Sequence, residues 1–396
     1  MKGNGKAAQI STNECLYYIY IFALLCAPMK VLPVMPIRVA VAFALLINNP
    51  VRMKNIVVPA ITFFVYSLFF FIQDNFGRDF FDPFDNYMKI VGIFEISVVG
   101  SSLLYTSDKT KGRLVKAAFW AICISIVTSS FYILKDVDAI RYRNSDYTYI
   151  MGFYQFYGYI LLPLSLVVLI AYGVANRKKV KGLIIVLALV FFLMLKGHLI
   201  TGMLLGFVGF FLGIYCIYTK KGKTIFLSLG FLAIIALVLK DYIAKSILFL
   251  IYRFHIEGIV QKRLLSVVNI INANDLLDSY GSRGMLIRRS FSSFMKCPFT
   301  GVGYSGYSQD TVGCHSEWVD TLAVYGLIGL ILILACFISI INSNRKILKD
   351  VMGKKIYFLT LFLFTVLGFL NPSFEIPIMG VVFIVVPCIS YYYEEG

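Results

Sequence analysis

Apolar residues in this chain occur in long blocks, and short polar segments rich in lysine and arginine separate the blocks. Most blocks have the length of about 18–22 residues that lets a helix cross a hydrocarbon core. Because a lipid-exposed backbone must satisfy its own hydrogen bonds, each block is predicted to be a membrane-spanning helix. The pattern predicts about twelve spans, at residues 15–29, 31–48, 55–73, 88–106, 114–134, 151–175, 182–197, 199–218, 224–240, 317–341, 356–370 and 376–393.

The charges between the blocks predict the orientation of the bundle. Basic clusters follow the second, fourth, sixth, eighth and tenth spans, whereas the loop after the third span, residues 74–85, is acidic. Loops rich in lysine and arginine stay in the cytoplasm, so both termini are expected there. The first apolar run lacks a clear small-residue cleavage site after it, which favours a retained span over a signal peptide. We therefore expect an all-α, polytopic helical bundle, with a single transmembrane domain over residues 1–396.

Composition excludes a soluble fold and changes the meaning of the net charge. The chain is 59% hydrophobic and 15% charged, whereas soluble domains carry about 25% charged residues. The formal charge of +16 is explained by cytoplasmic loops, so nucleic acid is not an expected partner. The cysteines form no C-x-x-C pair and thus no metal-site spacing. Cys297 and Cys314 share one predicted external segment, where a disulfide and two free thiols are both open.

One long segment, residues 241–316, interrupts the alternation of spans and short loops, and the span count places it outside. Long loops in compact proteins are usually functional or disordered. Apolar and basic residues recur here at helical spacing, over 243–254 and 285–294, which predicts amphipathic helices on the membrane surface. The segment is net basic, against the bias of the other external loops. An anionic partner outside is therefore expected.

An ordered set of residues in the last third of the chain carries most of the candidate chemistry. A basic amphipathic segment comes first, and a tight Pro-x-x-Gly-x-Gly turn follows it. A histidine then stands at the mouth of the tenth span, and two glycines one helical turn apart allow that span to approach a neighbour closely. The set consists of Arg283, Pro298, Gly301, Gly303, His315, Gly326 and Gly329.

This set resembles the O-antigen polymerase and O-antigen ligase family of membrane glycosyltransferases. The family signature is a histidine followed by Ser, Asn or Gln, then nine residues and Gly-x-x-Gly, which His315, Ser316, Gly326 and Gly329 fit. The family also has an arginine on an amphipathic segment before a Pro-x-x-Gly-x-Gly turn, about twelve spans and a large late external loop. The resemblance covers the topology of the whole chain, and residue motifs only in its last third.

The resemblance implies a metal-independent and cofactor-independent transfer reaction at the outer face of a bacterial cytoplasmic membrane. Undecaprenyl pyrophosphate carries the donor glycan and is the leaving group, and a sugar hydroxyl is the acceptor. Arginine suits pyrophosphate because its guanidinium offers paired donors, and histidine can act as a base near neutral pH. His315 and Arg283 are therefore the expected catalytic residues.

Further basic and acidic residues are expected around this pair. The mid-chain matches to the family are looser, because the expected Ser-Arg turn is missing at residues 196–202, after the seventh span, where Lys196 or His198 is the candidate substitute. Two of the arginines beside Arg283 suit lipid head groups equally well. The candidate pyrophosphate ligands are Arg283, Arg288, Arg289, Arg141, Arg143, Lys196 and His198. The candidates for holding the acceptor or orienting the imidazole are Glu317, Asp320 and Glu375.

Ionisable residues inside predicted spans are functional candidates because their burial is costly. Lys89 lies near a span end and is expected to snorkel toward the interface. Arg38 and Glu95 either pair with each other or line a cavity, and the sequence leaves both open. His255, in the external segment, is interpreted as structural.

These inferences predict a polysaccharide polymerase that builds O-antigen, capsule or exopolysaccharide. An O-antigen ligase with a lipid A-core acceptor uses the same chemistry, and the motifs do not separate the two. A lipid-linked sugar flippase or other transporter is the third candidate, but a transporter is expected to show related halves and broken helices at mid-membrane. The expected partners are the undecaprenyl-pyrophosphate-linked oligosaccharide, the bilayer and a chain-length regulator.

Overall fold

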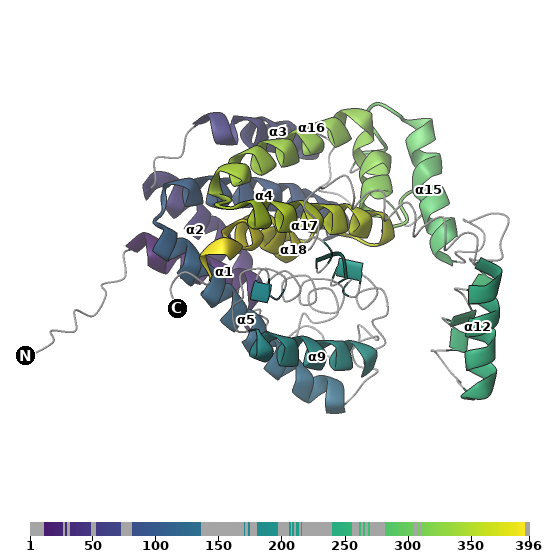
Figure 1. The fold of residues 1–396 in the computed structure, drawn as a ribbon. Coiled ribbons are helices and arrows are strands. Elements are labelled where there is room, and N and C mark those ends of the chain that lie inside the picture. The colour runs from purple at the N-terminus through teal and green to yellow at the C-terminus, as the bar shows by residue number, and fades with distance from the viewer. Residues whose placement is uncertain are drawn as a thin grey trace, which may run out of the picture.

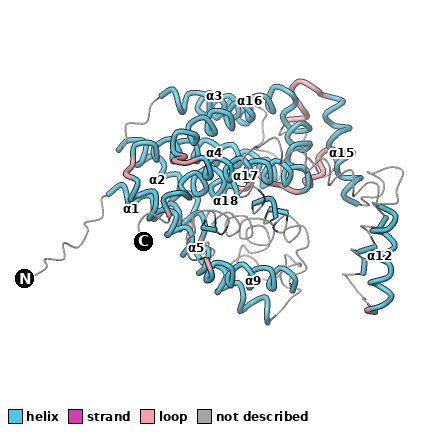
Figure 2. The backbone as a smooth tube through the Cα atoms, in the orientation of Figure 1, coloured by secondary structure: helices cyan, strands magenta, loops and turns pink. Residues whose placement is uncertain are grey.

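The described part of the chain is helical throughout. The computed structural model describes residues 12–26, 28–29, 32–48, 53–72, 81–135, 170, 173–174, 180–196, 206, 208–209, 211–213, 215, 240–255, 261–262, 264–265, 268–269, 282–303, 308 and 310–392. Within these residues there is no β-strand, and Figure 2 shows helices joined by loops. The predicted all-α class is confirmed.

Nine of the predicted spans coincide with helices of the structure. The remaining three, at 151–175, 199–218 and 224–240, lie largely outside the described residues. The nine correspond to α1 (Thr12–Leu25), α2 (Val34–Asn48), α3 (Met53–Ile72), α4 (Phe81–Ser102) with η3 (Leu103–Tyr105), α5 (Asp108–Lys135), α9 (Lys181–Lys196), α16 (Glu317–Ile347), α17 (Val351–Leu370), and α18 (Ile376–Gly380) continued by η5 (Val381–Val385) and η6 (Val386–Tyr391).

Four stretches of the described chain are long and apolar enough to cross a membrane: 55–72, 87–105, 317–347 and 351–370. The apolar helices at 34–48, 181–192 and 376–391 are shorter. Side chains on the outer face of α3 stay exposed although they are apolar, a pattern that marks a lipid-facing surface here rather than a soluble one. They are Ile61, Phe64, Leu68 and Phe71, which are 50–66% exposed. The protein is therefore a membrane protein built as a helical bundle.

Short turns and helix caps connect the last three spans, α16, α17 and α18. Asp350 ends the link after α16 and accepts a hydrogen bond from the Gly353 amide at 2.6 Å, which caps the start of α17. Residues 371–375 turn the chain back, and Pro377 sits in the first turn of α18, where a missing N–H costs nothing. Tyr357, Phe374 and other fully buried rings fill the space between these helices.

Several helices of the bundle run roughly alongside one another, and two helices of the long loop lie across them. In Figure 1, α3, α4, α16 and α17 run along the bundle, whereas α12 (Lys240–Arg253) and α15 (Ser282–Lys296) run across it at one end. Both fall where the sequence predicts amphipathic helices. Tyr242, Phe249 and Tyr252 of α12 are 64–78% exposed, as suits a helix on a membrane surface. His255 follows α12 with a positive φ of 46° and is exposed.

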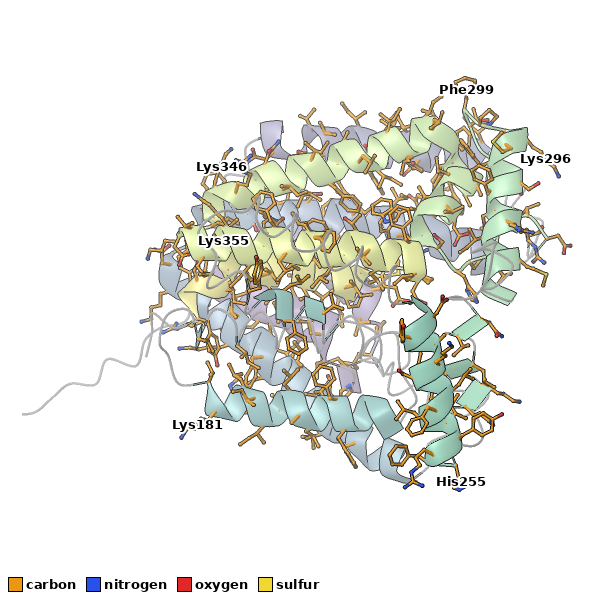
Figure 3. All side chains as sticks on the ribbon, turned by 45° about the vertical axis from the view of Figure 1, so that its right-hand side comes forward. Lys181, His255, Lys296, Phe299, Lys346 and Lys355 are labelled. Carbon is orange, nitrogen blue, oxygen red and sulfur yellow. The ribbon has the colours of Figure 1, made fainter. Side chains whose placement is uncertain are left out.

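The two ends of the bundle differ in charge. At one end, which we call the basic end, Arg113 pairs with Glu14 at 2.7 Å and Lys349 with Asp108 at 3.6 Å. These pairs bring together the starts of α1 and α5 and the end of α16. Figure 3 shows three labelled lysines at this end and two labelled residues of the segment 241–316 at the opposite end, which we call the loop end. The first three are Lys181, Lys346 and Lys355, and the other two are Lys296 and Phe299.

Arg38 and Glu95 form an ion pair inside the bundle. Arg38 Nε of α2 donates to Glu95 Oε1 of α4 at 3.0 Å, and the two side chains are 8% and 3% exposed. Glu95 also lines a small apolar pocket with residues such as Ala42 and Phe63. Of the two alternatives that the sequence left open, the pairing is present, and only Glu95 of the two residues lines this pocket. The pair joins α2 to α4 and satisfies two charges that would be costly to bury alone.

Candidate functional site at the loop end of the bundle

Helix α16 is broken near its start, at Gly326. This glycine has φ 64° and ψ −167°, a conformation almost restricted to glycine. The break interrupts the i to i+4 hydrogen bonds that would span Gly326, so carbonyl groups before it and N–H groups after it lose their helical partners. In a membrane, each such group costs several kcal/mol if it stays unsatisfied.

The Pro-x-x-Gly-x-Gly turn supplies new partners for four of these groups. Two amides of the turn donate to the carbonyls before the break, and two carbonyls of the turn accept from the amides after it. The bonds are Val302 N to Ala323 O at 2.8 Å, Gly303 N to Val324 O at 2.9 Å, Leu327 N to Pro298 O at 2.9 Å and Ile328 N to Phe299 O at 3.1 Å. Two motifs that are separate in the sequence therefore form one interlocked unit.

Gly301 and Gly326 are required by close contact between the backbones of the two motifs. A Cβ at Gly301 would meet the backbone of Val324, and one at Gly326 would meet the carbonyl of Phe299. A Cβ on Gly329 would approach the hydroxyl of Tyr66 on α3 to 2.5 Å. The predicted tight turn and the predicted close approach of the tenth span to a neighbour are both confirmed.

His315 lies in the loop that directly precedes α16, and this loop contacts helix α15. The residue is exposed, and its Nδ1 lies 2.8 Å from the carbonyl oxygen of Cys314. Because a carbonyl oxygen only accepts, this contact places the proton of a neutral imidazole on Nδ1 and leaves Nε2 as the acceptor. Cys314 has a positive φ of 56°, an uncommon conformation for a residue other than glycine.

Asp320 in the first turns of α16 connects this loop to α15. Its Oδ1 accepts from the hydroxyl of Ser290 at 2.5 Å, and its Oδ2 accepts from the amide of Ser316 at 2.9 Å. Ser290 also accepts a hydrogen bond from the amide of Gly313 at 2.8 Å. The carboxylate therefore holds the loop at both sides of His315.

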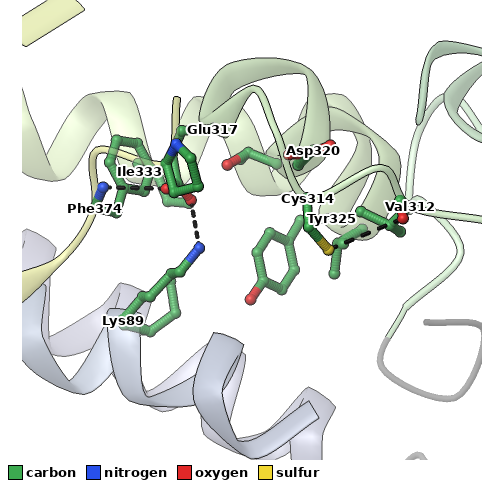
Figure 4. Close-up of a pocket in the computed structure, with 12 residues that line it drawn as sticks. Lys89, Val312, Cys314, Glu317, Asp320, Tyr325, Ile333 and Phe374 are labelled. Atoms are coloured by element: carbon green, nitrogen blue, oxygen red, sulfur yellow. Dashed lines mark hydrogen bonds and ion pairs between the residues drawn. The ribbon is translucent and has the colours of Figure 1, made fainter. Parts of the chain in front are cut away.

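Glu317 ties the start of α16 to two other elements. Its Oε1 accepts from Lys89 Nζ of α4 at 2.8 Å, and its Oε2 accepts from the amides of Ser373 and Phe374 at 2.9 and 3.1 Å. Figure 4 shows Lys89 reaching from its helix toward this carboxylate. The Glu317 side chain is 4% exposed and that of Lys89 is 27% exposed. Glu317 is thus a junction of α4, α16 and the turn before α18.

These groups line a small pocket at the loop end. Lys89, Cys314, Glu317, Asp320 and Tyr325 border it (Figure 4), and its volume is about 50 Å³. That space holds a few water molecules, so a sugar or a pyrophosphate does not fit inside. One ammonium faces two carboxylates here, which favours hydrogen-bond donors over phosphate. The basic helix beside the pocket suits phosphate better.

Helix α15 supplies that basic surface. It carries Arg283 in its first turn, then Arg288, Arg289 and Lys296, and no acidic residue. Arg288 is exposed and Arg289 is half-buried, while Ser290 is fully buried against the loop. Of Arg283 the structure describes the backbone alone. The helix that carries these basic residues is therefore the same helix that contacts the His315 loop.

The remaining predicted site residues divide into two groups. Arg141, Arg143 and His198 lie outside the described residues, and so does the side chain of Lys196 at the end of α9. Glu375 is half-buried at the residue before α18, in the turn whose amides bind Glu317.

Contacts in the structure bear on several of the expectations for individual residues. Among the described residues, neither Glu317 nor Asp320 hydrogen-bonds the imidazole, because both carboxylates are engaged with other groups. Lys89 does not simply snorkel, since it pairs with Glu317. Cys297 and Cys314 are both exposed and form no disulfide, which decides between the two alternatives that the sequence left open.

Sequence reasoning missed Ser290 and the role of the Cys314 carbonyl. Ser290 lies within a serine-rich helical segment, and its residue type does not distinguish it from its neighbours. The signal that could have found it is helical periodicity, which places it on the buried face of an amphipathic helix. The Lys89 partner is also hidden, since 228 residues separate the two side chains.

Comparison with known proteins adds no assignment to this geometry. No family model and no curated protein sequence matches the chain. Any functional conclusion therefore depends on the residues themselves.

Proposed function

We propose that this protein is a polysaccharide polymerase, an inverting glycosyltransferase that builds O-antigen, capsule or exopolysaccharide. Its donor is a glycan on undecaprenyl pyrophosphate, and its acceptor is a sugar hydroxyl of another repeat unit. The observation that carries the proposal is the junction at the loop end, where the interlocked motifs place the exposed His315 beside a helix with four cations and no anion. A base next to a cationic surface suits transfer from a pyrophosphate leaving group.

The chemistry assigns one role to each part of the junction. The acceptor oxygen attacks the anomeric carbon of the donor, and the bond from that carbon to the pyrophosphate oxygen breaks. His315 Nε2 takes the hydroxyl proton. General-base catalysis of this kind raises the rate of transfer by about 10²–10⁴-fold. The arginines of α15 stabilise the negative charge that develops on the leaving pyrophosphate. No metal or cofactor is part of this proposal.

The proposal includes about twelve spans in a bacterial cytoplasmic membrane, with both termini in the cytoplasm. The sidedness of the described helices supports it, because α1 and α5 begin at the basic end and α16 begins at the loop end. Because these two starts lie at opposite ends of the bundle, an odd number of membrane crossings is expected between them. The five predicted spans there agree with that expectation. The positive-inside rule assigns the basic end to the cytoplasm.

Two alternatives remain beside the polymerase. An O-antigen ligase shares the reaction and differs in its lipid A-core acceptor. The broken helix α16 favours a transporter, since discontinuous helices form many transporter binding sites. Here, however, four of the groups freed at Gly326 bind the backbone of residues 298–303 and are not presented to a solute. This difference supports an enzyme.

The deciding experiment uses purified protein in lipid nanodiscs with a lipid-linked repeat unit and gel analysis of chain length. His315→Ala is expected to lower turnover by about 10²–10⁴-fold and to keep donor binding, because the arginines provide it. His255→Ala is the matched control, since His255 is also exposed but follows α12. Polymer from the His315→Ala variant at the wild-type rate would remove His315 from the mechanism. Equal losses of donor binding and turnover would make it a phosphate ligand instead.

A further inference from the structure

The loop that carries His315 is held from both sides by one pair of side chains. On one side, the amide of Gly313 donates to Ser290 Oγ at 2.8 Å. On the other, the amide of Ser316 donates to Asp320 Oδ2 at 2.9 Å. The hydroxyl of Ser290 joins the two sides by donating to Asp320 Oδ1 at 2.5 Å. We call this pair, Ser290 and Asp320, the clasp.

We propose that the clasp is a positioning device that sets His315 against the cations of α15. The inference rests on the proposed function, because it concerns the geometry of that reaction. Ser290 belongs to α15 and Asp320 to α16, so their hydrogen bond fixes one helix relative to the other. Arg288 and Arg289 directly precede Ser290, and each residue advances a helix by about 1.5 Å. A fixed position of Ser290 therefore also fixes the backbone positions of Arg288 and Arg289 relative to His315.

Packing shows that the loop has little freedom at the clasp. Ser290 is 0% exposed and Ser316 is 1% exposed. A Cβ at Gly313 would lie 2.6 Å from the carbonyl carbon of Leu286, one turn before Ser290 on α15. The loop thus lies directly on the helix backbone. Within it, the carbonyl of Cys314 holds Nδ1 of the imidazole, so a shift of the loop would move Nε2 as well.

Asp320 acts through the loop rather than on the substrate. Both of its oxygens accept hydrogen bonds from groups of the protein, and the pocket that it lines holds about 50 Å³. An acceptor sugar does not fit in that space. Asp320 and Ser290 are therefore positioning residues, and the proton of the acceptor goes to His315.

The test compares Ser290→Ala and Asp320→Asn in the nanodisc transfer assay. Misplacement of a reacting group by about 1 Å costs about 10²-fold, so each variant is expected to lose about that factor in kcat. KM for the donor should stay unchanged. The double variant should lose no more than the worse single variant, because both changes open the same clasp. The pH dependence of the residual turnover should be that of the wild type, since the base is unaltered.

Two serines of the same helix provide matched controls. Ser292 is exposed, and its change to Ala should alter neither kcat nor KM. Ser293 is buried and donates to the carbonyl of Thr311 at 2.7 Å, outside the clasp, so Ser293→Ala tests general damage to α15. A kcat loss in Ser293→Ala as large as in Ser290→Ala would overturn the clasp. Complete inactivity of Asp320→Asn with loss of the acid limb of the pH profile would make Asp320 the base and also overturn it.

A geometric measurement separates failure of the clasp from failure of the proposed function. Cys314 and Met295 are both exposed. Spin labels on Cys314 and on Met295→Cys report the distance between the loop and α15 by pulsed electron paramagnetic resonance. The remaining cysteines are replaced by serine or alanine. Ser290→Ala and the isosteric Asp320→Asn should broaden the distance distribution, whereas Ser292→Ala should not. Unchanged distributions in both clasp variants would overturn the proposal, whatever reaction the protein catalyses.

Discussion

Gly326 shows how a single residue decides the geometry of the loop end. Its φ of 64° and the close contact that a methyl group at this position would make with the Phe299 carbonyl both exclude a side chain. Gly301 meets Val324 in the same way from the opposite motif. The spacing of glycines in the sequence therefore records two backbones that touch, which a packing argument alone would not distinguish from an ordinary helix contact.

The variant Gly326→Ala is expected to unfold the loop end. Strain at this backbone conformation costs about 1–3 kcal/mol, and displacement of residues 298–303 removes hydrogen bonds that satisfy the break. We expect a loss of about 3 kcal/mol or more in stability from these two causes together. Thermal unfolding of the purified variant measures it. Gly182→Ala is the control, because a Cβ there meets no atom within 4 Å. Equal melting temperatures for the two variants would show that the break tolerates a side chain.

Residue-level chemistry was only partly predictable from the sequence. The positions of His315, the turn and the two glycines follow from spacing, and the structure brings them together. The partners of Glu317 do not follow, because an ion pair across 228 residues leaves no mark on periodicity. Glu317 was expected to serve the imidazole or the acceptor, yet it binds Lys89 and two backbone amides.

At the scale of elements, the junction of α4, α16 and the turn before α18 depends on Glu317. Sequence patterns located the helices of the bundle well. For example, α3, α9 and α17 agree with the apolar blocks within several residues. The break inside α16 was not predicted, because an apolar block with an internal glycine has the pattern of a continuous span. What makes the break possible is the turn at 298–303, and its contact with the helix is a tertiary feature.

Substitutions at this junction should have unequal effects. Removal of one partner from a buried pair costs about 3–5 kcal/mol, and Glu317→Leu additionally leaves the amides of Ser373 and Phe374 unpaired. Lys89→Met should cost less, about 1–2 kcal/mol, because the lysine is partly exposed and Glu317 keeps two donors. The double variant should resemble Glu317→Leu. Chemical or thermal unfolding of the purified proteins measures the order, with Lys181→Met, an exposed lysine of α9, as the control. A larger loss in Lys89→Met than in Glu317→Leu would contradict this account.

At the scale of the whole molecule, the two ends of the bundle have different roles. The basic end gathers the ion pairs Arg113–Glu14 and Lys349–Asp108, which hold helix starts and ends together. The loop end gathers α15, the His315 loop and the pocket. The sequence predicted this division from loop charges, because the same rule that orients the spans also separates the two groups of residues. It could not give the packing order of the helices, since lipid-facing and buried apolar residues look alike in the sequence.

The orientation of the bundle can be measured directly. Asp310 and Lys349 are both exposed, and they lie in the segment 241–316 and at the basic end respectively. Single cysteines at these positions, in a background without other cysteines, are treated with a membrane-impermeant maleimide on intact cells. The positive-inside rule predicts labelling at Asp310→Cys and protection at Lys349→Cys until the membrane is permeabilised. A background that keeps only Cys15, which is exposed in the first turn of α1, should behave like the second variant, because its neighbour Glu14 pairs with Arg113 at the basic end. The reverse pattern would place His315 and α15 in the cytoplasm. Transfer of a glycan at the outer face would then be impossible for this chain, even if every contact at the loop end were correct.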